Sequence, residues 1–97
     1  LMTQRAPSHE SLFFLAEMDG VPKLDLHGMR VHEAVVALDQ FLNHEFMAGS
    51  EIVTIVHGYG TGALKQAVHE QLQAISFVDQ FRLSEKTGGM THVVLTS

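Results

Sequence analysis

Two residues able to do acid–base chemistry stand close together in the segment LDLHG, residues 24–28. Apolar and polar residues alternate here, which predicts a short strand with Asp25 and His27 on one side and the two leucines on the other. A carboxylate beside an imidazole can fix the imidazole tautomer and favour proton transfer. The same pair also fits a purely structural role, in which Asp25 only orients His27 or caps a neighbouring backbone amide.

A second segment, HGYGTGALK at residues 57–65, places three glycines within five residues, between an apolar stretch and a helical pattern. Such a loop can turn its backbone amides toward a phosphate at the positive end of a helix, and Lys65 can add a point charge. Tyr59 can stack on a base. The spacing fits neither a Walker loop nor a dinucleotide fingerprint, so nucleotide hydrolysis is not indicated. The alternative is a turn that binds nothing.

The elements that must position these residues follow from hydrophobic periodicity. A strand at 24–27 precedes an amphipathic helix over 30–47, and the β-branched stretch 51–57 predicts an inner strand. A second helix covers roughly 64–75, and strands follow near 77–83 and 91–96. The predicted fold is α/β, a two-layer βαβαββ sandwich with a four-stranded mixed sheet and two helices on one face. The helical crossovers predict parallel pairing of the first three strands. The short connection between the last two strands predicts that these two are antiparallel.

This topology brings the two polar segments together. His27 and His57 each end a predicted strand and each precede a glycine, so parallel pairing delivers them to the same edge of the sheet with Asp25. Open α/β sheets bind ligands outside the carboxyl ends of their strands, which makes this edge the expected site. His92 is a weaker candidate for the edge. His9, His32, His44 and His69 are interpreted as surface residues.

Composition bounds the class of protein. The 97 residues suffice for one domain, with 23–97 as its body and 1–22 as a linker or N-terminal extension with one docking turn. There is no cysteine, no apolar run long enough to span a membrane and no signal peptide, which favours the cytoplasm. The chain begins without methionine, so we expect a part of a longer protein, monomeric as an isolated domain. The net charge of −5 argues against strong nucleic-acid binding, although seven histidines can add positive charge as pH falls.

Taken together, LDLHG and HGYGTGALK about 30 residues later resemble the Smr domain, the C-terminal domain of bacterial MutS-related recombination suppressors. The resemblance covers residues 22–97. It implies a βαβαββ fold similar to the C-terminal domain of a translation initiation factor, and nicking or cleavage of DNA or RNA. The family's Leu-Asp-x-His motif falls on residues 24–27 and its His-Gly-x-Gly motif on 57–60. The family's Gly-Gly-x-Gly turn reads Gly88-Gly89-Met90-Thr91 here, a departure at the third wall of the site.

The favoured hypothesis is an endonuclease domain in which Asp25 orients His27, and His27 or His57 transfers a proton. The scissile phosphate would be held by a second set of residues: Arg30, Gly58, Tyr59, Gly60, Thr61, Gly62 and Lys65. On RNA the 2′-hydroxyl can attack, whereas DNA needs an activated water and perhaps a divalent ion such as Mg²⁺ or Mn²⁺, which one aspartate and two histidines could hold.

Two other hypotheses stay open. The chain can be a non-catalytic module for branched or single-stranded nucleic acid, or a protein-interaction domain that docks through Phe13, Phe14 and Met18.

Overall fold

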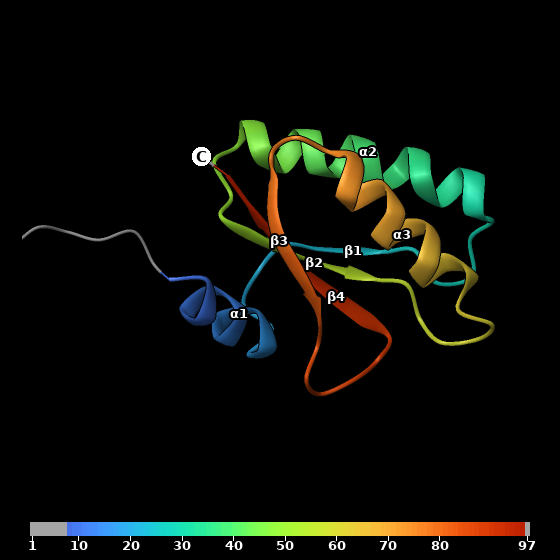
Figure 1. Ribbon diagram of the computed structural model, residues 1–97, viewed down its shortest axis with the longest axis horizontal. Coiled ribbons are helices and arrows are strands. Elements are labelled where there is room, and N and C mark those ends of the chain that lie inside the picture. The colour runs from blue at the N-terminus through green and yellow to red at the C-terminus, as the bar shows by residue number, and fades with distance from the viewer. Residues whose placement is uncertain (1–7, 97) are drawn as a thin grey trace, which may run out of the picture.

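The computed structural model describes residues 8–96. Its elements are α1 (His9–Glu17), β1 (Lys23–Asp25), α2 (Val31–Met47), β2 (Ile52–Val56), α3 (Ala63–Ala74), β3 (Val78–Leu83) and β4 (Met90–Leu95) (Figure 1). From β1 onward this is the predicted order βαβαββ. The helices α2 and α3 lie together on one face of the sheet, as predicted, and α1 lies on the other (Figure 1).

The sheet is four-stranded and mixed, in the order β1-β2-β4-β3. β1 pairs with β2 in parallel, and β4 is antiparallel to both of its neighbours, β2 and β3. The predicted parallel pairing of the first three strands is therefore wrong for the third, which runs in the direction of β1 and β2 but does not pair with β2. The reason is burial. Residues 91–95 of β4 are all buried, so β4 takes the inner position, whereas β3 consists only of exposed and half-buried residues and suits an edge.

The main core lies between the sheet and the two helices of the α2 and α3 layer. Ala34, Leu38 and Leu42 recur every four residues and are fully buried, which explains why α2 packs along a single stripe. Val68 and Leu72 do the same on α3. This layer holds the carboxyl ends of β1 and β2 in place, with Asp25 in register with Val56.

The opposite face carries a smaller core under α1. Leu12, Phe13 and Ala16 of the helix pack on Ile52 of β2 and Val94 of β4. The helix starts at Ser8, whose hydroxyl accepts a hydrogen bond from the Ser11 amide at 3.1 Å, the usual role of an N-cap serine. The apolar pattern of residues 12–18 thus corresponds to a nine-residue helix that covers part of the open face.

Candidate functional site

Asp25 and His27 form an exposed pair at the carboxyl end of β1. The His27 Nδ1–H donates to Asp25 Oδ1 at 2.5 Å, and the backbone amide of His27 donates to the same oxygen at 3.0 Å. These two bonds lower the pKa of the Asp25 carboxyl, the side-chain bond contributing most. The side chains are 69% exposed for His27 and 55% for Asp25. The arrangement fixes Nδ1 as the donor and leaves Nε2 with a lone pair for a proton from solvent or a ligand.

The glycine loop lies directly against this pair. Gly58 has φ of +74°, and a Cβ atom there would lie 3.0 Å from the Cβ of His27, so only glycine allows the two segments to approach this closely. Gly60 and Gly62 also have positive φ, a backbone conformation in which other residues are strained. The Thr61 hydroxyl caps the first amide of α3, that of Ala63, at 3.3 Å.

A cavity of about 140 Å³ opens at this loop, at the N-terminus of α3. It is lined by Gly58, Tyr59, Gly60, Gly62, Lys65 and Gly88. Backbone amides at a helix N-terminus and one lysine suit an anion. The structure thus brings together Asp25, His27 and most of the residues that the sequence assigned to a phosphate.

His57 shares the edge but not the exposed surface. It follows β2 at the same end of the sheet as His27, as predicted. Its side chain is 1% exposed, however, and lies beneath the loop, where it faces the helix layer. The two imidazoles thus share an edge of the sheet but face different sides of it. Alternation along the extended chain explains the difference, since His57 continues the inward row of Val53 and Ile55.

The buried imidazole of His57 belongs to a chain of hydrogen bonds. Its Nδ1–H donates to the Gly58 carbonyl at 3.2 Å, so its Nε2 accepts from the Thr91 hydroxyl at 2.9 Å. The Thr91 oxygen in turn accepts from His69 Nε2–H at 2.7 Å. Burial, first of all, lowers the pKa of both histidines, and the positive charge of Lys65 lowers both further.

His69 is thus not the simple surface residue that the sequence suggested. The signal for its position is its spacing of four residues from Lys65, which places both on the same face of α3.

The β3–β4 turn forms the third wall of the site. The Gly89 carbonyl accepts hydrogen bonds from the amides of His57 and Gly58, both at 3.0 Å. The Tyr59 hydroxyl is hydrogen-bonded to the Thr87 hydroxyl, and Gly89 is close enough for a Cβ to lie 3.2 Å from the Tyr59 ring. The turn therefore supports the loop even though its sequence departs from Gly-Gly-x-Gly.

Charge is unevenly distributed over the molecule. Among residues 8–96, three basic side chains bind acceptors on α1 or just after it: Lys23, Arg82 and Lys86. Arg30 and Lys65, the other two in this range, make no ion pair with described residues and stand at the starts of α2 and α3. Within residues 8–96, the basic side chains without an ion pair therefore both stand at the edge that carries the glycine loop.

The residues do not fit the metal site that the sequence allowed. Within residues 8–96, no group of three or more histidine, aspartate or glutamate side chains lies where it could hold an ion. Asp25 and His27 are paired with each other, whereas His57 is bonded to Thr91 below the loop.

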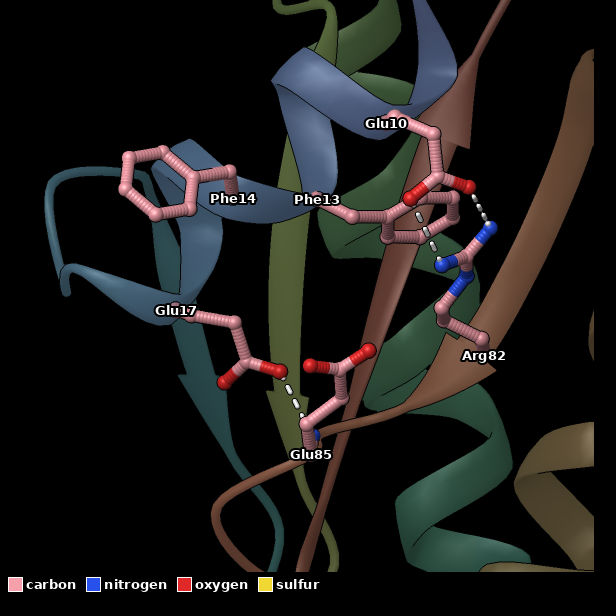
Figure 2. A pocket seen from close by; sticks show the side chains of 6 residues that line it. All are labelled: Glu10, Phe13, Phe14, Glu17, Arg82 and Glu85. Carbon is pink, nitrogen blue, oxygen red and sulfur yellow. Dashed lines mark hydrogen bonds and ion pairs between the residues drawn. The ribbon is translucent and has the colours of Figure 1, made fainter.

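A second cavity, of about 110 Å³, lies between α1 and the end of β3, and Figure 2 shows its side chains. Glu10, Glu17 and Glu85 line it together with Arg82, whose guanidinium is bound by Glu10 and stacks on Phe13, 3.9 Å from the ring centre. Three carboxylates repel a phosphate, so this cavity is a poor nucleic-acid site. Because Phe13 is buried here, only Phe14 and Met18 of the expected docking trio are exposed.

His92 lies away from the edge, contrary to the weaker expectation for it. It sits in β4, opposite Thr54 of β2, and its Nδ1 is 2.7 Å from the Thr54 hydroxyl. Its Nε2 is 3.1 Å from Glu17 Oε1, and both side chains are largely buried. Side chains alternate along β4, so that Thr91 faces His69 of α3 and His92 faces Glu17 of α1 on the opposite side of the sheet.

Comparison with known proteins identifies the family to which this sequence and fold belong. The model of the Smr domain family matches residues 24–96. Two relatives named endonuclease MutS2 share 42% identity over 66 residues (Brevibacillus brevis) and 40% over 68 residues (Pelotomaculum thermopropionicum). These matches cover 68% and 70% of this chain but only 8% and 9% of the relatives.

Two solved structures are similar to this one. The Smr domain of Thermus thermophilus MutS2 aligns with a TM-score of 0.76 and 36% identity, over 79% of this chain and all of that one. YdaL, a stand-alone small MutS-related protein from Escherichia coli, aligns with a TM-score of 0.79 over 98% of this chain and 82% of that one, and its 18% identity supports the fold alone. None of the helices within residues 8–96 has the length and apolar character needed to cross a membrane.

Proposed function

Because the chain belongs to the Smr domain family, we propose that it binds nucleic acid in the cytoplasm and cuts a phosphodiester bond, either nicking DNA or cleaving RNA. The observation that carries this proposal is the contact between Asp25–His27 and the glycine loop. An exposed imidazole of fixed tautomer stands beside Gly58, which also lines the cavity that contains Lys65. A proton acceptor and a phosphate site are thus adjacent, as hydrolysis of a phosphodiester requires.

In the proposed mechanism the loop amides and Lys65 hold the phosphate, Arg30 binds a neighbouring one, and His27 Nε2 removes a proton from the attacking oxygen. Asp25 keeps the Nδ1–H of His27 in place and stabilises the imidazolium that forms. His57 stays neutral and holds the loop from below through Gly58 and Thr91. Of the two histidines proposed from the sequence, we assign the proton transfer to His27.

The attacking oxygen distinguishes the two substrates. On RNA it is the 2′-hydroxyl, which bonds to phosphorus as the bond to the 5′-oxygen breaks, so that a 2′,3′-cyclic phosphate forms and the leaving 5′-oxygen takes a proton from solvent. On DNA it is a water, which bonds to phosphorus as one P–O ester bond of a strand breaks, and the leaving oxygen is protonated by solvent.

The test is a cleavage assay with supercoiled plasmid and with structured RNA, each with and without chelator. We expect cleavage by the wild type and its loss in His27→Ala. His44→Ala is the matched control, because His44 is an exposed histidine in the last turn of α2, which leads into the start of β2, whereas the loop follows the other end of that strand. Equal cleavage by all three proteins would assign the activity to other residues or to a contaminant.

A binding module without catalysis is the second candidate, and one observation favours it. Only one of the two proposed histidines is exposed, and only two cations at the edge are free of ion pairs with described residues. A wild type that never cleaves but binds branched or single-stranded nucleic acid, and loses binding in Lys65→Ala, would establish this alternative.

A further inference from the structure

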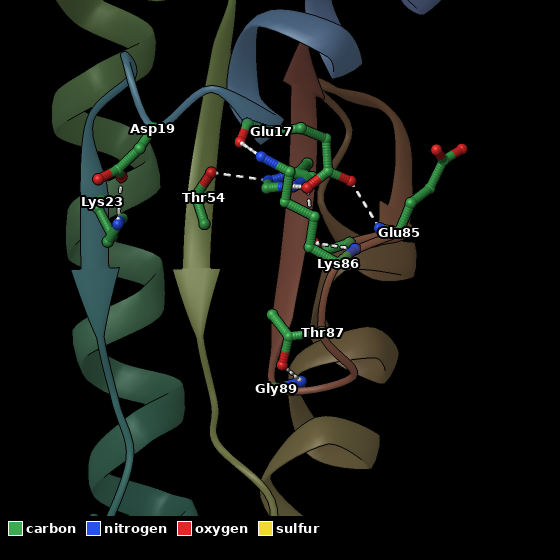
Figure 3. Close-up of polar contacts among 10 residues, drawn as sticks. Glu17, Asp19, Lys23, Thr54, Glu85, Lys86, Thr87 and Gly89 are labelled. Atoms are coloured by element: carbon green, nitrogen blue, oxygen red, sulfur yellow. Dashed lines mark hydrogen bonds and ion pairs between the residues drawn. The ribbon is translucent and has the colours of Figure 1, made fainter.

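Glu17, near the end of α1, binds the β3–β4 turn through its carboxylate and its backbone. The Ser84 hydroxyl donates to Oε1 and the Glu85 amide to Oε2, both at 2.6 Å, and the Lys86 ammonium donates to the Glu17 carbonyl at 2.9 Å (Figure 3). The Glu17 side chain is only 14% exposed. The side chain thus holds two consecutive residues of the turn, and its main chain holds a third.

The same turn reaches the glycine loop at its other end. Thr87 accepts a hydrogen bond from the Gly89 amide at 3.1 Å and is bonded to the hydroxyl of Tyr59. Gly89 then accepts from the amides of His57 and Gly58. Hydrogen bonds at both ends of the turn, joined by the backbone from Lys86 to Thr87, therefore connect α1, which lies outside the part of the chain that matches the family model, to the loop beside His27.

We propose that Glu17 is a positioning residue for the nucleic-acid site, which fixes the β3–β4 turn so that Thr87 and Gly89 hold Tyr59 and Gly58 in their binding geometry. The inference rests on the proposed function, since the loop is taken to be the phosphate site. It adds a role for α1, which supplies no residue that lines the loop cavity.

The alternative for α1 makes the opposite prediction. By binding Lys86, the helix could withhold a positive charge from a phosphate at the neighbouring loop. Freeing the turn would then raise affinity rather than lower it. Positioning is favoured because the Glu17 carboxylate binds Ser84 and the backbone of Glu85, and neither contact sequesters a cation.

The experiment compares Glu17→Gln with Glu10→Gln in the 97-residue chain. Both replace a glutamate of α1 by its amide, but Glu10 binds Arg82 in β3 and leaves the turn untouched. The readouts are affinity for a labelled single-stranded DNA oligonucleotide, amide exchange at Gly58, and tyrosine fluorescence. Tyr59 is the only tyrosine and there is no tryptophan, so the fluorescence reports on the loop alone.

For Glu17→Gln we expect faster exchange at Gly58, altered Tyr59 fluorescence and an affinity weakened by about 3- to 30-fold, the range of coupling through packed and hydrogen-bonded residues. Glu10→Gln should leave all three unchanged. Thr87→Val breaks the path at its other end without touching α1, and should reproduce the loss even if Glu17→Gln fails to fold.

Unchanged loop signals in Glu17→Gln, equal effects in both glutamine variants, or a gain in affinity would each overturn the proposal. The exchange and fluorescence readouts need no nucleic acid. A wild-type protein that does not bind nucleic acid would therefore refute the proposed function, but the link from Glu17 to the loop could still be measured.

Discussion

Two carboxylate–histidine pairs occupy opposite situations in this molecule. Asp25 and His27 stand more than half exposed at the carboxyl edge of the sheet, whereas Glu17 and His92 are 14% and 2% exposed between α1 and β4. The first pair leaves a ring nitrogen available to solvent beside the glycine loop. In the second, His92 Nδ1 lies 2.7 Å from the Thr54 hydroxyl and His92 Nε2 lies 3.1 Å from Glu17 Oε1, while the Glu17 carboxylate accepts from the Ser84 hydroxyl and the Glu85 amide. The same two functional groups thus fit chemistry in one place and the docking of a helix in the other.

The largest effect on cleavage should come from replacing His27, the histidine of the exposed pair, by alanine. His27→Ala should reduce cleavage by about 10²- to 10⁴-fold, the usual cost of losing a positioned acid or base. Its unfolding free energy should stay within about 0.5 kcal/mol of wild type, because the side chain is exposed. Initial rates on plasmid and RNA, together with urea unfolding, measure both. A His27→Ala protein that cleaves normally would contradict the contrast between the pairs.

His92→Ala should show the reverse pattern. It leaves the buried Thr54 hydroxyl and the Glu17 carboxylate short of a partner, which should lower the unfolding free energy by about 1–3 kcal/mol. Urea unfolding followed by circular dichroism measures the loss, and His32→Ala, at an exposed position of α2, serves as control. Stability equal to wild type would mean that the buried pair contributes nothing to holding α1.

Acid should weaken the buried pair in a defined pH window. Burial raises the pKa of Glu17, but hydrogen bonds from Ser84 and the Glu85 amide and the contact with His92 outweigh it and lower the pKa to about 2. A carboxyl whose pKa is depressed on folding contributes stability above its unfolded value near 4.5, and loses it as pH falls toward 2.

Unfolding free energies measured across this window should fall with pH in wild type and fall less steeply in Glu17→Gln. Parallel curves for the two proteins would rule out Glu17 as the source of this loss of stability in acid.

His57 and His69, whose pKa values are lowered, add a separate loss of stability that begins as pH drops below about 6.5.

The smallest effect is expected at a single cation of the exposed site. Lys65→Ala should weaken DNA binding and reduce the slope of log affinity against log salt by about 1, the signature of one lost phosphate contact. Lys23→Ala should leave the slope unchanged, because Lys23 is paired with Asp19 at the other end of β1. Fluorescence anisotropy at several salt concentrations is the measurement. Equal slopes for the two variants would contradict the proposal that Lys65 contacts a phosphate.

Most of the fold was predictable from the sequence because its signals are local. The four-residue stripe of Ala34, Leu38 and Leu42 marked α2, and alternation marked β1 with Asp25 and His27 outward. The shared edge of His27 and His57 followed from parallel pairing of β1 and β2. The insertion of β4 between β2 and β3 did not follow, since the order of strands depends on which strand is buried on both faces.

The sequence by itself determined which residues end the strands and where the glycines turn the chain, because these depend on spacing and on backbone freedom. Only the tertiary structure decided which histidine is exposed. His57 continues an inward row and meets Thr91 and His69 from distant segments, whereas His27 turns outward beside Gly58. The partners of Glu17 lie more than 60 residues away along the chain. No local pattern encodes such contacts, since they arise from the packing of whole elements.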